Sequence, residues 1–271
     1  MLFRSLKLAM RTVELETAGL SVRVDECGGG PPLLYLSPEH FIPANDAFVE
    51  RLGESFRVVV PRYPGFDGTA PAGDFRRVED LTYLLMDVVE QLSLDDVHVV
   101  GSSLGGWLGL ELAVRQSSWM RTMSLVSPLG VKFGDRETRG YADLNALPKP
   151  ELEAALFAQR DGAPSFADMD DATLEQFGLE RQYLAYYAWN PYLHNPSLRR
   201  WLHRVRIPVQ LLWGTEDGYN RPDNAQPLAN ALPDASVTWL EHVGHYPQLE
   251  APERLLDPIL SFIRAHDGRP A

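Results

Sequence analysis

The sequence predicts an α/β fold in which a mostly parallel sheet is flanked by helices. Two patterns predict it. Short apolar runs bounded by Gly, Pro or Ser recur along the chain, as expected for strands buried on both faces. Stretches with apolar residues at helical spacing separate these runs, which is typical of βαβ units. The 271 residues, 45% hydrophobic and 23% charged, allow one large globular domain.

The first elements differ from those that follow. Thr12–Glu16 and Leu20–Cys27 alternate apolar and polar residues around Ala18-Gly19, which predicts an antiparallel hairpin at a sheet edge. Helices are predicted at Val78–Leu92 and Leu104–Arg115, where apolar residues share one face. The predicted buried strands are Leu33–Leu36, Val58–Val60, Val97–Val100, Met123–Val126 and Val209–Trp213, and a last strand is expected at Ser236–Leu240.

The alternation stops after Pro128 and returns at Val209. Between them no buried-strand pattern occurs, and many large aromatic residues do. We therefore expect one core domain, residues 1–131 and 205–271, divided after its sixth strand by a helical insertion at residues 132–204. Helical patterns within the insertion cover Glu151–Arg160, Ala172–Trp189 and Ser197–Val205.

Charge and cysteine content exclude several classes of function. The net charge of −12 repels polyanions, so no nucleic acid partner is expected, and binding to an anionic membrane is disfavoured. Cys27 is the single cysteine, which excludes an intramolecular disulfide and suits a reducing cytoplasm. No apolar run reaches the roughly 20 residues of a membrane span, and Met1–Arg11 lacks the apolar core of a signal peptide. We expect a cytoplasmic protein; a homodimer is compatible with the sequence.

One glycine-rich motif has the context of a nucleophile. Gly101-Ser102-Ser103-Leu104-Gly105 follows a predicted buried strand and opens a predicted helix, as a G-x-S-x-G nucleophile elbow requires. A side chain in place of either glycine would crowd the turn. The alternative is a plain strand-to-helix turn in which Ser103 caps the helix. The context favours Ser103 as a nucleophile.

A serine nucleophile needs a base, and the base needs an acid that orients it. His245 lies in a loop between the last predicted strand and a helix that begins near Pro252, with His242 as its rival. Asp217 follows the strand Val209–Trp213, with Glu216 as the neighbouring alternative. The carboxyl ends of parallel strands share one edge, where sites of such sheets lie. The order Ser103, Asp217, His245 predicts a catalytic triad.

Together these motifs resemble the α/β-hydrolase superfamily over essentially the whole chain. Their order and spacing carry the resemblance, which implies that the insertion is a helical lid over the active site. The matching segments are Pro-Gly-Phe-Asp-Gly at 64–68, the elbow at 101–105, Trp-Gly-x-x-Asp ending at Asp217, and the segment from Gly244 to Pro252.

The chain departs from many relatives in one loop. Where they have His-Gly after the strand Leu33–Leu36, this sequence has Ser37-Pro38-Glu39-His40. An oxyanion hole needs two donors, and Pro38 has no N–H. We expect the backbone N–H groups of Leu104 and Glu39 to be these donors.

The predicted function is a serine hydrolase that forms an acyl-enzyme without metal or cofactor. The aromatic insertion favours a small apolar or aromatic substrate, with a pocket expected around His40, Tyr187, Trp189 and Tyr246. A carboxylic ester is the first candidate. A carbon-carbon bond hydrolase of aromatic ring-fission products is the second. An acyltransferase, a perhydrolase and a non-catalytic ligand-binding protein on the same scaffold remain as alternatives.

Overall fold

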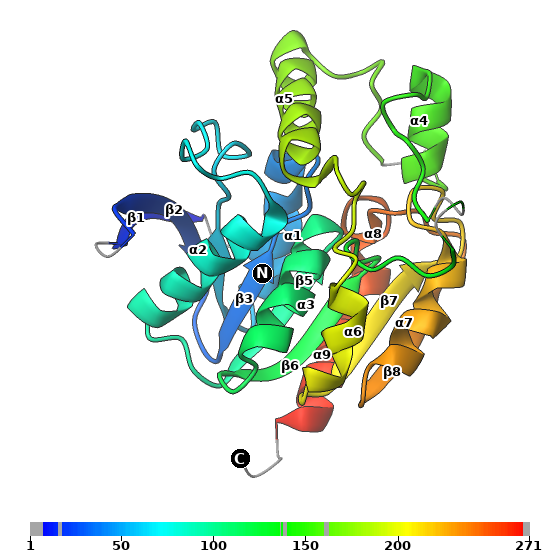
Figure 1. The fold of residues 1–271 in the computed structure, drawn as a ribbon. Coiled ribbons are helices and arrows are strands. Elements are labelled where there is room, and N and C mark those ends of the chain that lie inside the picture. Colours follow the sequence, from blue (N-terminus) through cyan, green and yellow to red (C-terminus); the bar gives the residue numbers. More distant parts are fainter. Residues whose placement is uncertain (1–7, 16–17, 136, 138–139, 160–162, 268–271) are drawn as a thin grey trace, which may run out of the picture.

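One twisted sheet organises the chain (Figure 1). The computed structural model describes residues 8–15, 18–135, 137, 140–159 and 163–267. The strands are β1 Ala9–Leu15, β2 Leu20–Cys27, β3 Pro32–Leu36, β4 Arg57–Pro61, β5 Val97–Ser102, β6 Met120–Val126, β7 Val209–Gly214 and β8 Ala235–Leu240. Their order in the sheet is β1-β2-β4-β3-β5-β6-β7-β8. β1 and β2 pair antiparallel, as do β2 and β4, and the other pairs are parallel. The predicted mostly parallel α/β sheet is confirmed.

Helices cover both faces of this sheet (Figure 1). α2 Val78–Gln91, α3 Leu104–Arg115 and α7 Ala225–Ala231 pack on one face, and α1 Ile42–Leu52 and α9 Pro252–His266 on the other. The short helix α8 Pro247–Glu250 precedes α9, and the 3-10 turn η2 Pro222–Asn224 precedes α7. The helix predicted at Val78–Leu92 forms and ends one residue earlier, at Gln91. The helix predicted at Leu104–Arg115 forms with the predicted bounds.

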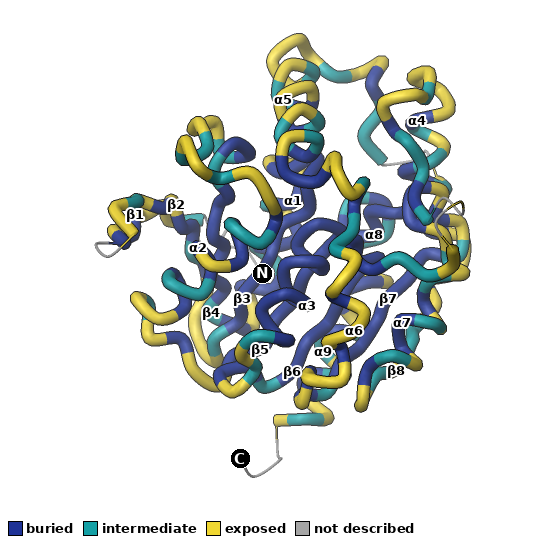
Figure 2. Tube along the Cα trace, in the orientation of Figure 1, coloured by how far each residue is buried: buried dark blue, intermediate teal, exposed yellow. Residues whose placement is uncertain are grey.

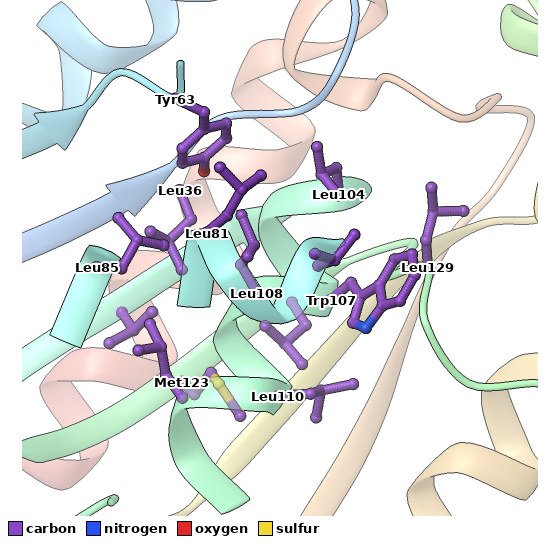
Figure 3. Close-up of a cluster of buried hydrophobic side chains, with 14 of the residues drawn as sticks. Leu36, Tyr63, Leu81, Leu85, Leu104, Trp107, Leu108, Leu110, Met123 and Leu129 are labelled. Atoms are coloured by element: carbon purple, nitrogen blue, oxygen red, sulfur yellow. The ribbon is translucent and has the colours of Figure 1, made fainter. Parts of the chain in front are cut away.

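Two hydrophobic cores result from the period of two along each strand. Leu34 and Leu36 of β3 point to the core under α2 and α3, whereas Leu33 and Tyr35 point to the core under α1 and α9. Figure 3 shows the side chains of α3 at the centre of the first core. Figure 2 shows that the central strands and α3 are buried along most of their length. This packing holds the loops at the strand ends in fixed positions.

The segment between β6 and β7 carries further helices. Figure 1 shows the first two beyond the end of the sheet, whereas the third lies beside α3. Phe177 stacks on Phe41 of the core with ring centroids 4.9 Å apart, so this segment contacts the loops at the sheet edge. The helix predicted at Glu151–Arg160 begins two residues earlier and ends already at Leu156; Arg160 itself lies outside the described residues. Among the described residues, no helix is long and apolar enough to cross a membrane. The helices are α4 Lys149–Leu156, α5 Asp171–Ala188 and α6 Leu198–Trp201, followed by the 3-10 turn η1 Leu202–Arg204.

Candidate active site

The turn between β5 and α3 has the strained backbone of a nucleophile elbow. Ser103 has φ 51° and ψ −111°, a conformation that L residues rarely adopt and that persists only where the surroundings enforce it. A Cβ at Gly101 would lie 2.6 Å from the carbonyl oxygen of Gly105. A Cβ at Gly105 would lie 2.0 Å from the carbonyl oxygen of Leu36. Only glycine fits at both positions, and the Ser103 side chain is projected out of the turn.

Three residues from separate segments meet at this turn. His245 Nε2 lies 2.7 Å from Ser103 Oγ, and His245 Nδ1 lies 2.8 Å from Asp217 Oδ2. The other carboxylate oxygen, Oδ1, accepts the backbone N–H groups of Tyr219 and Asn220 at 3.0 and 2.8 Å. All three residues are buried. Because both carboxylate oxygens are fixed, Asp217 orients the imidazole with Nε2 toward the serine.

His242 and Glu216, the alternatives to His245 and Asp217, pair with each other instead. His242 Nδ1 lies 2.8 Å from Glu216 Oε1, and both side chains are more than half exposed. They lie next to the triad in sequence but point to solvent. Cys27, the single cysteine of the sequence, is buried, and desolvation raises the pKa of its thiol to about 11. A thiol with that pKa stays protonated and unreactive near neutral pH.

The side chain of Glu39, in the loop after β3, lies directly beside the nucleophile Ser103. The backbone N–H of Leu104 donates to Glu39 Oε2 at 3.0 Å, and the N–H of Glu39 itself also hydrogen-bonds this carboxylate. Ser103 Oγ donates to Glu39 Oε1 at 2.9 Å. The two backbone groups expected to form the oxyanion hole therefore converge, and what they bind is the carboxylate of Glu39.

Two of the four expected pocket residues adjoin this carboxylate. Tyr246 donates its O–H to Glu39 Oε1 at 2.8 Å, and His40 Nδ1 lies 3.0 Å from the same hydroxyl. Tyr187 lies apart: it stacks on Phe66 and donates to the carbonyl oxygen of Pro64. Trp189 also lies apart, 56% exposed at the end of α5. The abundance of aromatic residues in the insertion does not reveal which of them face the site.

The electrostatics of the loop couple Glu39 to His40. Burial alone would raise the pKa of Glu39, but protonated imidazoles of His40 and His245 and the backbone N–H groups outweigh it, so the pKa lies below the ordinary value. Burial lowers the pKa of His40 to about 4, against the attraction of Glu39. Because His40 attracts the carboxylate only while it carries a proton, the two groups titrate as a coupled pair.

A buried acid on α5 also belongs to this neighbourhood and carries no sequence motif. Glu180 accepts the backbone N–H of Phe41 at 2.7 Å and that of Ile42 at 3.3 Å. It thereby binds the insertion to the loop that carries Glu39. Because Phe41 and Glu180 lie 139 residues apart in the sequence, no local sequence pattern predicts this contact.

A narrow cavity of about 10 Å³, room for about one water molecule, lies between α5 and the core beside this loop. Three buried side-chain atoms on its lining residues have no hydrogen-bond partner among the described residues: His40 Nε2, Arg181 Nε and the Tyr219 hydroxyl. The ring of Tyr219 contacts that of His245, with centroids 4.6 Å apart. The cavity therefore adjoins the triad. Its lining residues are His40, Leu144, Asn145, Arg181, Leu184, Ala185, Ala188, Tyr192, Leu193 and Tyr219.

Similar proteins share this architecture at low sequence identity. Lipase 1 of Psychrobacter immobilis is 22% identical over 258 residues, which cover 86% of this chain and 77% of the lipase. A bacterial membrane phospholipase A matches the structure with a TM-score of 0.80 at 20% identity, over 97% of this chain and 87% of that one. The 2-hydroxy-6-oxo-6-phenylhexa-2,4-dienoate hydrolase of Rhodococcus sp. strain RHA1 gives 0.75 at 19%, over 96% and 99%. These structural likenesses show the fold.

The family follows from a broader match. The family model described as "Alpha/beta hydrolase family" matches residues 28–257, a range that includes the elbow and both partners of Ser103. The sheet order, the strained turn at Ser103 and this match agree with one another. The chain belongs to the alpha/beta hydrolase family.

Proposed function

We propose that this protein is a serine hydrolase that cleaves a small apolar or aromatic carboxylic ester through an acyl-enzyme on Ser103. One observation carries the proposal: the buried, continuous chain of hydrogen bonds from Asp217 through His245 to Ser103 Oγ. A serine hydroxyl becomes a useful nucleophile only when a positioned base takes its proton, and this chain supplies that base.

The reaction proceeds in two halves. Ser103 Oγ attacks the substrate carbonyl while its proton passes to His245 Nε2, and the imidazolium then protonates the leaving alcohol. Water adds to the acyl-enzyme, again giving a proton to His245, and the acid product and free Ser103 result. The backbone N–H groups of Leu104 and Glu39 stabilise the oxyanion in each half once the hole is open. These steps need no metal or cofactor.

The insertion at residues 132–204 acts as a lid in this proposal. The narrow cavity beside the triad is lined mainly by apolar side chains, several of them from α5, which supports an apolar substrate that parts α5 from the core as it binds. Substrate enters between α5 and the core and contacts both before it reaches Ser103.

A carbon-carbon bond hydrolase of aromatic ring-fission products is the second candidate, and the cavity favours it in one respect. Arg181 donates to the carbonyl oxygen of Leu144 and to Asn145 Oδ1, both neutral, while its Nε has no partner within the described parts of the chain. A half-buried guanidinium with neutral partners can bind a carboxylate, which ring-fission products carry and simple aryl esters lack.

The test compares wild type with Ser103→Ala and with His242→Ala, a matched control at an exposed histidine. We expect Ser103→Ala to lower the turnover of aryl esters by roughly a thousandfold or more, because the nucleophile is gone, and His242→Ala to keep most of the rate. A Ser103→Ala variant that retains the full rate would contradict the mechanism. Faster turnover of a ring-fission dienoate than of any aryl ester would select the second candidate.

A further inference from the structure

The carboxylate of Glu39 occupies the place where the substrate's oxygen must go. Donors of an oxyanion hole lie about 2.7–3.1 Å from the oxyanion, and the N–H of Leu104 lies 3.0 Å from Glu39 Oε2. Oε1 lies 2.9 Å from Ser103 Oγ. One oxygen is therefore in the hole and the other is at the nucleophile. A carboxylate product of hydrolysis would bind in the same way.

Glu39 is held in this place on every side. Besides Ser103 and Leu104, the O–H of Tyr246 binds Oε1 at 2.8 Å, and Glu39 is fully buried. Glu180 fixes the loop itself, because it accepts the backbone N–H of Phe41. Phe41 has a left-handed backbone with φ 57°. Residues from several separate segments of the chain therefore hold the Glu39 carboxylate in this position.

A count of protons shows that the site is closed to reaction in this state. Between His245 Nε2, Ser103 Oγ and Glu39 Oε1, two short contacts of 2.7 and 2.9 Å need two protons, and the serine supplies one. The second proton is on His245, which then cannot act as a base, or on Glu39.

We propose that Glu39 is a specificity-determining residue: its carboxylate fills the oxyanion hole, and only substrates whose binding moves the loop Ser37–Phe41 gain access to Ser103. The inference rests on the proposed function of Ser103. The carbonyl oxygen of a substrate cannot enter the hole while an oxygen of Glu39 occupies it, because both would need the same position beside the N–H of Leu104. Glu39 must leave before acylation.

The cavity indicates which substrates can move it. The cavity has room for about one water molecule, so a substrate that enters here must push α5 and the loop apart. It then touches His40, which follows Glu39 in the loop, and Arg181 and Leu184 of α5, the helix whose Glu180 binds the same loop. Binding energy from these remote contacts can be used to displace Glu39. A small neutral ester makes few such contacts and leaves Glu39 in place. Glu39 thus discriminates by size.

The experiment measures kcat/KM for p-nitrophenyl acetate and for p-nitrophenyl 4-phenylbutyrate, and the rate at which an alkyl fluorophosphonate labels Ser103. The variants are Glu39→Ala, Glu39→Gln and the control Glu216→Ala, an exposed glutamate near the triad. We expect Glu39→Ala to raise labelling and kcat/KM for the acetate about tenfold or more, and to raise kcat/KM for the phenylbutyrate much less. Glu216→Ala should match wild type.

Glu39→Gln covers the case in which the alanine variant does not fold. Glutamine keeps the volume and the contact with Leu104 but has no negative charge, so a smaller increase with the acetate ester is expected. Equal or lower kcat/KM for the acetate in folded Glu39 variants, with Ser103 still labelled, would overturn the inference alone. Absence of Ser103 labelling and of turnover in every folded variant would instead overturn the proposed function.

Discussion

The orientation of one imidazole controls the chemistry of Ser103. Asp217 accepts two backbone N–H groups on one oxygen and faces His245 Nδ1 with the other, so its position is fixed independently of the histidine. A ring held in this way presents Nε2 to the serine. In the proposed mechanism the carboxylate also stabilises the imidazolium that forms during each half of the reaction.

The first prediction concerns this carboxylate. Asp217→Asn should keep the fold, because its side-chain oxygen can still accept the N–H groups of Tyr219 and Asn220. Its amide would donate to Nδ1 and favour the wrong tautomer of His245, so kcat should fall by roughly ten-thousandfold. Steady-state kinetics with an aryl ester test this, and Glu216→Asn is the neighbouring control. Loss of less than tenfold would show that Asp217 does not orient the base.

At this scale the sequence predicted which three residues meet at the turn after β5 but not that the carboxylate of Glu39 lies beside them. Ser103, Asp217 and His245 each follow a recognisable strand. Their order did not separate them from His242 and Glu216, which the structure places together at the surface. For Glu39 the backbone N–H was expected to matter, and the direction of the carboxylate could not be foreseen. That direction depends on Tyr246 and on the turn after His40, where Phe41 adopts a left-handed backbone that Glu180 supports.

At the scale of elements, α5 and α1 are joined by a buried acid. Glu180 accepts the backbone N–H groups of Phe41 and Ile42, at the start of α1, and an amide N–H of Gln176, and it lies near the carboxyl group of Glu39. Its pKa is raised to about 7, chiefly because burial disfavours the charged form. The contact between α5 and the start of α1 therefore depends on pH.

The second prediction follows from the sign of this shift. In the unfolded chain the glutamate ionises near its ordinary pKa, whereas the folded protein keeps the proton up to about pH 7. The folded state thus binds more protons between these values, and stability falls as pH rises through that range, by about 3 kcal/mol at most. Glu180→Gln, which cannot ionise, should be more stable than wild type at pH 8 and similar to it near pH 4.5. Urea unfolding at both values tests this; an equal difference at both would contradict it.

The alternation of patterns predicted which elements form, because buried strands and amphipathic helices have different periods. The ends of the helices in the insertion were less well predicted. The expected helix Ser197–Val205 is divided into α6, which ends at Trp201, and a 3-10 turn. The sequence alone did not provide the order of the strands either, since β3 lies between β4 and β5 through contacts distant in the chain.

At the scale of the whole molecule, a single sheet separates two hydrophobic cores. Leu85 of α2 is buried in one, and Ile259 of α9 in the other. Every central strand contributes side chains to both, so neither core can be lost without disturbing the strands that support the other. The loops that carry Glu39, Ser103, Asp217 and His245 all extend from these strands, and the geometry of the site depends on both cores together.

The last prediction tests this dependence. Leu85→Ala and Ile259→Ala each remove a nearly fully buried side chain on opposite faces of the sheet, and each should lower the free energy of unfolding by about 2–5 kcal/mol. Met10→Ala, at a side chain 67% exposed in β1, should change it by less than about 0.5 kcal/mol. Denaturant unfolding followed by tryptophan fluorescence and by esterase activity should give one coincident transition in all three variants. Separate transitions for activity and fluorescence in either core variant would contradict the prediction. They would mean that the core on one face of the sheet unfolds alone, and that the geometry of the triad depends only on the core on the other face.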